Sequence, residues 1–468
     1  MWAIKLLDQE KSSTTYSFKN NIEKEVEKFV GIEVYATSKI NGIKGEYKVL
    51  YKDFIVKEIE KNGRILDIKE DYTSPSFSKE LTDKFTTFNL VKVNKDTFEA
   101  VKKISKALKI PYNLFSYSGL KDKQSISVQK VSIKGNYVEQ LKNLKIRDIF
   151  IRNVYPTKKP VKLGSHLGNS FTITIRNLDN VKQLKQNIDK NLKFLRNYGF
   201  PNYFGLQRFG NYRPNSHIIG HFLLKGDYEN AFKEYVSTTY STEPIDSRKV
   251  RSDFRNNGDL EKAYNNFPKI LRYERNMIQY LIENGNDYQG AINTLPIDLI
   301  RLLISSFQSY LFNRMLSLRI KKGLPLFKPV NGDVICILDD YDGNISDVKY
   351  LFGGTYDKYL KRALKSNRAS IVLPIIGKKT ALDEYPIMEA IFKEITKLDQ
   401  IDENIFQSKY IDETEFKGSI RAMTVKPNDL KMLKFTDDEY YPGKKKIKIE
   451  FSLKKGTYAT MLLRELLK

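Results

Sequence analysis

The sequence predicts an α/β protein of the α+β kind, with strands in its first and last parts and helices between them. Apolar and polar residues alternate, as in strands with one buried face, in residues 47–59, 86–93, 171–175 and 444–453. Residues 213–420 differ, because their apolar residues recur at helical spacing and Asn, Tyr and Lys are frequent. This change in apolar spacing and residue composition indicates that the middle of the chain forms a separate domain.

The elements of the first part follow in the order strand, strand, helix, loop and strand. Phe54 and Val56 share one face of the first strand, and Phe88 and Leu90 share one face of the second. A helix is expected over residues 98–108, since its apolar side chains recur every three or four positions. These side chains are Phe98, Val101, Ile104 and Leu108.

One short stretch after this helix is the most informative. Gly119 offers a turn position, and Asp122 stands between Lys121 and Lys123 just before a strand-like run. The apolar phase of that run then shifts near Gln129 and Lys130, which predicts a bulge or kink there. Taken alone, an acid between lysines in a polar turn is most often a solvated surface loop. A site at Asp122 therefore needs support from the rest of the chain.

The composition favours a globular protein with a polyanionic partner. The chain has 468 residues, of which 41% are hydrophobic, with 80 Lys and Arg against 56 Asp and Glu and a net charge of +24. Such a positive field attracts RNA, DNA or an anionic membrane. A membrane is disfavoured, because no run of about 18 apolar residues occurs, and the first residues do not form a signal peptide. We expect a cytoplasmic protein.

Motifs for metal or cofactor chemistry are incomplete. The single cysteine, Cys336, lies in an apolar strand-like run, where an inert buried thiol is expected. His217 and His221 are four residues apart, yet no HExxH pattern completes a zinc site. Residues 377–380, GKKT, are similar to the end of a phosphate-binding loop, but Val372 stands where that loop requires its first glycine. We therefore expect neither a metal nor a cofactor.

A second loop combines aromatic side chains with glycines. Residues 201–210 read PNYFGLQRFG and follow a predicted helix. Ordinary core aromatics are the simpler interpretation of Phe204, and Arg208 could either bind phosphate or brace the loop. In the middle of the chain, residues 299–320 form the clearest amphipathic helix, with Ile300, Leu303, Ile304, Phe307, Leu311, Met315 and Leu318 on one face.

Three stretches resemble, in the same order along the chain, the signatures of the TruD family of tRNA pseudouridine synthases. They read GLKDK at residues 119–123 with Gln129, NYFGLQRFG at 202–210, and FSL, GTYAT and REL within 451–466. Weaker support comes from Lys48 and from the segment SYLFN at 309–313. One departure is visible, since Tyr51 and Lys52 replace the usual Pro-Glu before Asp53.

The resemblance implies a mixed-sheet catalytic domain of the pseudouridine synthase type, assembled from residues 1–212 and 421–468. It also implies a helix-rich insertion domain of the TruD type over residues 213–420. The family isomerises uridine to pseudouridine in tRNA, and its main substrate is uridine 13. Since this reaction conserves every atom, it requires no cofactor.

The resemblance also assigns roles to single residues. Asp122 matches the catalytic aspartate, for which a nucleophilic role agrees with the residue type. Phe204 matches the residue that would stack on the target uracil, and Asn202 would hold the catalytic loop. Lys48 matches a basic residue near the aspartate, so we predict an ion pair with Asp122. Substrate contacts are further expected from Lys121 and Arg208.

Other functions remain open at this point. A basic RNA-binding or RNA-folding protein without catalysis would have the same charge and aromatic content. It would have no need of Asp122 together with Asn202 and Phe204. A metal-dependent nuclease is weakened by the lack of a carboxylate and histidine cluster. We expect tRNA, and in some cases other RNAs, as the partner, with no membrane and no obligate protein partner.

Overall fold

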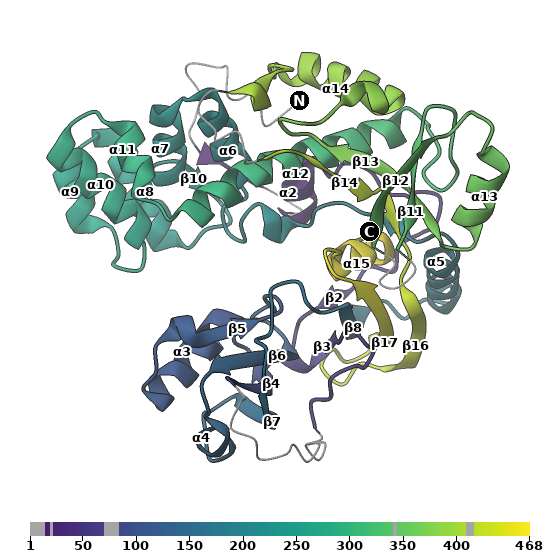
Figure 1. Ribbon diagram of the computed structural model, residues 1–468, viewed down its shortest axis with the longest axis horizontal. Helices are drawn as coiled ribbons and strands as arrows, with labels where there is room; N and C mark the ends of the chain where they lie inside the picture. Colours follow the sequence, from purple (N-terminus) through teal and green to yellow (C-terminus); the bar gives the residue numbers. More distant parts are fainter. Residues whose placement is uncertain (1–14, 19–21, 70–83, 340–343, 409–415) are drawn as a thin grey trace. The chain divides into compact units, whose positions relative to one another are not determined.

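The computed structural model describes residues 15–18, 22–69, 84–339, 344–408 and 416–468 (Figure 1). The chain divides into two compact units. Unit 1 contains Met1–Ala36 and Pro201–Thr424, and unit 2 contains Thr37–Phe200 and Val425–Lys468. Two short strands, β9 (Phe200–Pro201) and β15 (Thr424–Val425), lie where the chain passes from one unit to the other.

These boundaries differ from the expected ones at 212 and 420. Residues before 37 belong to unit 1 because they pair with its elements: β1 (Thr15–Tyr16) pairs in parallel with β10 (Thr239–Tyr240). Val30, directly after α2 (Ile22–Phe29), contacts the long helix α12 (Ile297–Lys321). Its carbonyl oxygen accepts from the side chain of Asn313 in α12 at 3.1 Å. Such partners lie far away in the sequence, so local patterns do not reveal them.

Unit 2 is built on a mixed sheet, which has nine strands among the described residues. The order along the sheet is β16-β17-β8-β3-β6-β4-β7, with β2 paired to β8 and β5 to β6. Neighbouring strands run antiparallel, except that β3 and β6 are parallel. The bounds are β2 Glu46–Tyr47, β3 Phe54–Ile59, β4 Phe85–Val93, β5 Phe115–Tyr117, β6 Ile126–Lys134, β7 Ile149–Thr157, β8 Gly168–Leu178, β16 Asn428–Asp437 and β17 Lys445–Lys454.

The two ends of unit 2 are joined within this sheet. Strand β17 comes from the end of the chain and lies between β16 and β8, with Phe451 opposite Phe171. A buried charge cluster adds a second link, because the guanidinium of Arg176 contacts Asp53 and Asp438 at 2.8 Å each. The sheet therefore depends on segments that are far apart in the sequence.

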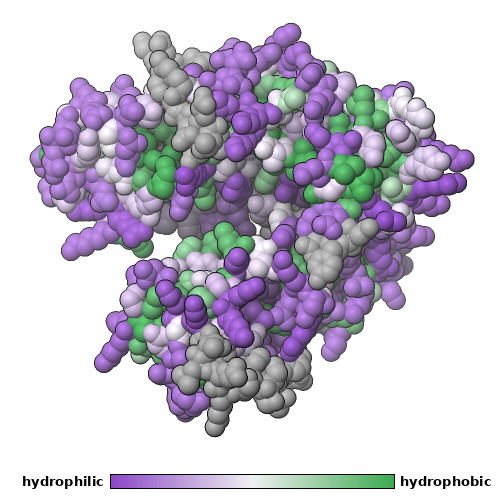
Figure 2. Space-filling view, in the orientation of Figure 1, coloured by the Kyte–Doolittle hydropathy of each residue, from purple (hydrophilic) through white to green (hydrophobic). Residues whose placement is uncertain are grey.

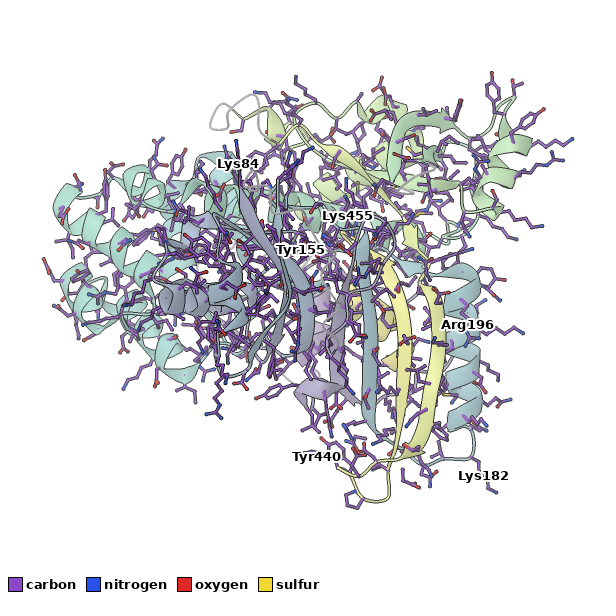
Figure 3. All side chains as sticks on the ribbon, turned by 60° about the horizontal axis from the view of Figure 1, so that its bottom comes forward. Lys84, Tyr155, Lys182, Arg196, Tyr440 and Lys455 are labelled. Carbon is purple, nitrogen blue, oxygen red and sulfur yellow. The ribbon has the colours of Figure 1, made fainter. Side chains whose placement is uncertain are left out.

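Helices α3 (Thr97–Leu108) and α4 (Val138–Lys142) contribute to a core on one face of the sheet. Ala100, Val101 and Ile104 of α3 pack with Phe88, Leu90, Val131 and Ile133, which confirms the predicted helix and strand. Helices α5 (Leu184–Tyr198) and α15 (Ala459–Leu467) pack on one another. Figure 3 shows α5 beside β16, and Arg196 of α5 donates to the carbonyl oxygen of Leu430 at 2.7 Å.

The predicted bulge near Gln129 is wrong. Strand β6 pairs with β4 without a register shift from Ile126 to Lys134. Its apolar phase changes because the two faces of the strand are covered at different places. Val128 packs with Val91 on one face, whereas Val131 belongs to the α3 core on the other. A strand with cover on both faces does not need to alternate.

Unit 1 contains a smaller sheet and a series of helices, of which those within residues 216–293 lie side by side at the left of Figure 1. The helices are α6 Ser216–Lys225, α7 Tyr228–Val236, α8 Ile245–Asn257, α9 Leu260–Asn266, α10 Arg272–Asn284, α11 Tyr288–Asn293, α13 Asp357–Lys365 and α14 Pro386–Asp399, in addition to α2 and α12. The sheet has the order β12-β11-β13-β14, and its strands are β11 Val334–Leu338, β12 Ile345–Leu351, β13 Ala369–Ile375 and β14 Ser419–Ala422.

Helix α12 is the core helix of unit 1, as the spacing of residues 299–320 predicts. It is buried on nearly all sides from Ser306 to Ser317, because it packs against α6, α14 and β13.

Cys336 is buried in β11, and burial raises the pKa of its thiol to about 11, so it is an inert thiol as expected. Within the part of the chain that the structure describes, no helix is both long and apolar enough to span a membrane.

Candidate active site

Asp122 lies in the loop between β5 and β6, with its side chain 31% exposed. The ammonium Nζ of Lys48 is 3.0 Å from its Oδ2, so the predicted ion pair is present. Lys48 follows β2 and has a φ of +62°, a left-handed backbone conformation that a residue with a side chain rarely adopts. Its Nζ also lies 4.4 Å from the centroid of the Phe54 ring. The ammonium is thus confined between a carboxylate and an aromatic face.

The backbone of Asp122 is held by a buried lysine that sequence reasoning missed. Lys92 of β4 donates from Nζ to the carbonyl oxygens of Lys95 at 2.6 Å, Lys121 at 3.2 Å and Asp122 at 2.8 Å. Burial lowers the pKa of Lys92 to about 8, against the opposing effect of the Asp122 charge. Its position within an otherwise apolar strand, LVKV, is the signal that could have revealed it.

A chain of hydrogen bonds fixes the loop before Asp122. The hydroxyl of Thr97, the first residue of α3, donates to Oε1 of Gln129 at 2.9 Å and accepts from the N–H of Lys121 at 3.0 Å. The Gln129 amide donates in turn to the carbonyl oxygen of Gly119 at 2.9 Å. The glutamine of the sequence motif therefore positions the loop that carries the acid.

Lys121 differs from the expected substrate contact. Its side chain is only 4% exposed, and its Nζ lies 3.2 Å from Oε2 of Glu58 and donates to Asn169 at 2.6 Å. Burial lowers the pKa of Lys121, while the Glu58 carboxylate opposes that shift. The Ser118 hydroxyl also donates to Glu58, at 2.5 Å. Glu58 and Lys121 thus form a buried pair behind the loop, and the side chain of Lys121 is turned away from solvent.

In unit 1, Asn202 fastens the aromatic loop to the end of β14. Its buried amide donates to the carbonyl oxygen of Ala422 at 2.9 Å and accepts from the Arg421 guanidinium at 2.7 Å. The backbone of Asn202 also bonds to Met423 and Arg421. The side chain and backbone of Asn202 are thus bonded to the end of β14 and to the residue after it within unit 1.

Phe204 is partly exposed and held on both sides. Its N–H donates to the Asn313 side chain at 2.8 Å, and that side chain returns a bond to the Phe204 carbonyl oxygen at 3.0 Å. The Phe312 ring meets the Phe204 ring edge-on at 5.5 Å, and the guanidinium of Arg421 lies 4.1 Å from its centroid. The Phe204 ring is thus packed against Phe312 and Arg421, and part of it remains exposed.

Arg208 is engaged by helix α12. Its guanidinium donates to the hydroxyls of Ser305 at 2.8 Å and Ser309 at 3.2 Å, and its carbonyl oxygen accepts from Ser306 at 2.9 Å. Of the two roles left open by the sequence, this geometry favours bracing of the loop over phosphate binding.

Comparison with known proteins identifies the family. The sequence profile described as tRNA pseudouridine synthase D (TruD) matches residues 29–466. The chain belongs to the TruD family. The predicted family, mixed-sheet fold and enzyme class, an isomerase of uridine in RNA, are thereby confirmed.

TruD relatives resemble the chain over nearly its whole length. A probable tRNA pseudouridine synthase D of Methanococcoides burtonii is 30% identical, covering 96% of this chain and 98% of the relative. One of Thermococcus sibiricus is 33% identical, with 92% and 96% covered. The crystal structure of a putative tRNA pseudouridine synthase D (TruD) from Methanosarcina mazei matches with a TM-score of 0.75 and 29% identity, covering 95% of this chain and 98% of that one.

The six candidate site residues are divided between the two units of this TruD protein. Asp122, Lys48 and Lys121 belong to unit 2, whereas Asn202, Phe204 and Arg208 belong to unit 1. In the described ranges, no group of three or more His, Cys, Asp and Glu side chains could hold a metal ion. His217 and His221 are buried and stack on Tyr310 and Phe307. In unit 2, the loop held by Lys92, Thr97 and Gln129 presents the partly exposed carboxylate of Asp122.

Proposed function

We propose that this protein converts uridine 13 of tRNA to pseudouridine, with Asp122 as the nucleophile. The observation that carries the proposal is the ion pair between the partly exposed Asp122 carboxylate and Lys48. The loop that carries Asp122 is held by a hydrogen bond from Lys92 to the Asp122 carbonyl oxygen. An ionised carboxylate in a fixed position is the group that nucleophilic catalysis needs. A tRNA substrate is consistent with the expected cytoplasmic location.

The reaction is an isomerisation in which atoms balance without a cofactor. The bond between C1′ of the ribose and N1 of uracil breaks, the base turns, and a bond between C1′ and C5 forms. The proton on C5 is released, and N1 ends with a proton. Asp122 would attack C6 of the base or C1′ of the sugar, or assist elimination to a glycal; all three routes need the same carboxylate.

Among the other candidate residues, one would bind the target base and the rest would hold the loops of the site. Phe204 would stack on the uracil after it leaves the helical stack of the RNA, a contact that offsets part of the cost of unstacking. Asn202 and Arg208 would hold the Phe204 loop, through Ala422 and the serines of α12. Lys121 would act through Glu58 to position the Asp122 loop. The net charge of +24 would supply attraction for the RNA backbone.

The test is pseudouridine formation on an unmodified tRNA transcript, detected by carbodiimide modification and primer extension. The intact protein is compared with Asp122→Asn, which keeps the size of the side chain and removes its charge. EDTA is present throughout, so that metal-dependent cleavage cannot contribute. A transcript with cytidine in place of uridine 13 is the matched substrate control.

Conversion of uridine 13 by the intact protein, and RNA binding without conversion by the variant, support the proposal. Conversion at another position would overturn the choice of uridine 13 alone. If the variant converts as fast as the intact protein, Asp122 is not the nucleophile. If neither protein modifies tRNA while both bind it equally, the alternative of an RNA-binding protein without catalysis replaces the enzyme.

A further inference from the structure

Exposed tyrosines and cations gather on one part of unit 1. They lie on β12, the outer strand of the small sheet, on α13, which follows it, and at the residue directly before α13. We call this surface the tyrosine patch and define it by Tyr350, Tyr356, Tyr359, Lys358, Lys361, Arg362 and Lys365. In Figure 2 the region of α13, at the right, shows hydrophilic residues beside pale and green ones.

The aromatic part of the patch is open to solvent. Tyr356 is 59% exposed and Tyr359 is 66% exposed, unlike most large apolar side chains of the unit. The rings of Tyr350 and Tyr356 lie 5.6 Å apart at 56°. Tyr356 directly precedes α13, and its carbonyl oxygen accepts from the N–H of Tyr359 in the first turn at 2.9 Å. Their flat faces are available to a partner that stacks.

The charged part of the patch is positive and available. Helix α13 carries Lys358, Lys361, Arg362 and Lys365 against a single acid, Asp357. The side chain of Leu360 is buried beneath the helix, so the four cations occupy its solvent side. Within the described ranges, none of the four forms an ion pair with a carboxylate, although the Lys361 ammonium lies 5.2 Å from the centroid of the Phe352 ring. Cations of this kind release counterions when they meet phosphates.

Aromatic faces beside unpaired cations are the chemistry of single-strand nucleic-acid binding, in which bases stack and phosphates are neutralised. A protein interface of the same size would instead be depleted of lysine at its core. We propose that the tyrosine patch is a binding site for an unpaired segment of RNA, separate from the target uridine. The inference rests on the proposed function for the class of its partner, and it adds a second contact on unit 1.

The first test measures the binding of the full-length protein to a fluorescent oligoadenylate of about ten nucleotides, within the size range of single-strand sites. Tyr356→Ala with Tyr359→Ala should weaken binding by at least about 30-fold, because stacking on both rings is lost. The matched pair Tyr356→Phe with Tyr359→Phe keeps both rings and should bind within about twofold of the intact protein. KM for tRNA should rise in the alanine pair.

The second test addresses charge. Lys358→Gln with Arg362→Gln should weaken binding and reduce the slope of log affinity against log salt by about 1.4, since about 0.7 is lost per phosphate contact. The control pair, Lys249→Gln with Lys262→Gln, removes the same charge from exposed positions on α8 and α9 of the same unit. It should leave the slope unchanged.

The proposal falls if the alanine pair binds the oligonucleotide as tightly as the intact protein. It also falls if the control pair weakens binding as much as the α13 pair, because the effect would then come from overall charge. Loss of self-association in sedimentation, with RNA binding intact, would make the patch a protein interface instead. Asp122→Asn should bind the oligonucleotide normally, so a failure of the isomerase proposal is distinguishable from a failure of the patch.

Discussion

The ammonium of Lys48 lies 3.0 Å from the carboxylate of Asp122, although 74 positions separate them in the chain. The left-handed backbone of Lys48, with φ of +62°, costs free energy that the surrounding structure must offset. Strained residues of this kind gather at functional sites. The pair therefore places a cation with a restrained backbone beside the carboxylate that we propose as the nucleophile.

Replacing Lys48 by Met should reduce the single-turnover rate on tRNA by about 10- to 100-fold. A hydrogen bond to a charged group contributes about 1.5–3 kcal/mol, and the carboxylate would lose its positioning partner. Lys52→Met, at an exposed site in the next turn, is the control and should have little effect. A Lys48→Met protein with the rate of the control would remove the pair from the mechanism.

Phe204→Leu should lower kcat/KM by about 5- to 150-fold, corresponding to the 1–3 kcal/mol that stacking of one base contributes. Phe204→Tyr keeps the ring and should retain most of the activity. Both variants keep the backbone bonds to Asn313. Steady-state kinetics on tRNA would check this, and equal losses in both variants would speak against stacking.

Lys92 gives a pH dependence of stability whose sign follows from its lowered pKa. Between the folded pKa of about 8 and the ordinary value of 10.5, the unfolded chain binds more protons than the folded one. The cost of burying the ammonium is therefore present in full below pH 8 and is relieved as the pH rises through this window. The free energy of unfolding of the intact protein should rise relative to Lys92→Met by up to about 1.4 kcal/mol per pH unit.

Urea unfolding of both proteins at several pH values from about 8 to 10 would measure this difference. Other lysines and tyrosines titrate in both proteins, so their effects cancel in the comparison. A difference that stays constant with pH would show that Lys92 titrates normally.

His217 and His221 give a pH dependence of the same sign in the acid range. Burial lowers the pKa of both to about 3, from an ordinary value of 6.5. Below pH 6.5 the unfolded chain gains protons that the folded chain does not, so stability falls by up to about 1.4 kcal/mol per pH unit for each histidine. His221→Phe should reduce the slope in urea unfolding between about pH 6 and pH 4 by up to about 1.4 kcal/mol per pH unit. An unchanged slope would contradict a buried neutral His221.

Arg176→Met should destabilise unit 2 by about 3–5 kcal/mol, because Asp53 and Asp438 would remain buried without their partner. Lys444→Met breaks an exposed pair with Asp179 and should destabilise the protein far less than Arg176→Met does. Thermal and urea unfolding of the two variants would compare them. Equal losses would mean that burial does not set the strength of these pairs.

The sequence predicts those parts of the fold that local spacing determines. Strands β3 and β4 and helices α3 and α12 follow from their apolar spacing, and the Lys48–Asp122 pair follows from family motifs. Lys92 was missed, since a lysine in an apolar run does not reveal which carbonyl groups it will meet. The phase change in β6 was misread because both faces of that strand are covered. Local spacing could not place the residues before 37 in unit 1, because their partners, β10 and α12, lie far away in the sequence.

The position of β17 between β16 and β8 has a consequence for synthesis on the ribosome. Residues 37–200 emerge first but lack the strand that pairs with β8 until residues 201–424 have been made. At about 5–20 residues per second, this delay lasts on the order of ten to forty seconds. During that time the open edge of β8, with Ile173 and Ile175, presents unpaired backbone groups to other nascent chains. Unit 2 therefore passes through an aggregation-prone stage in which chaperones that bind nascent chains would shield it.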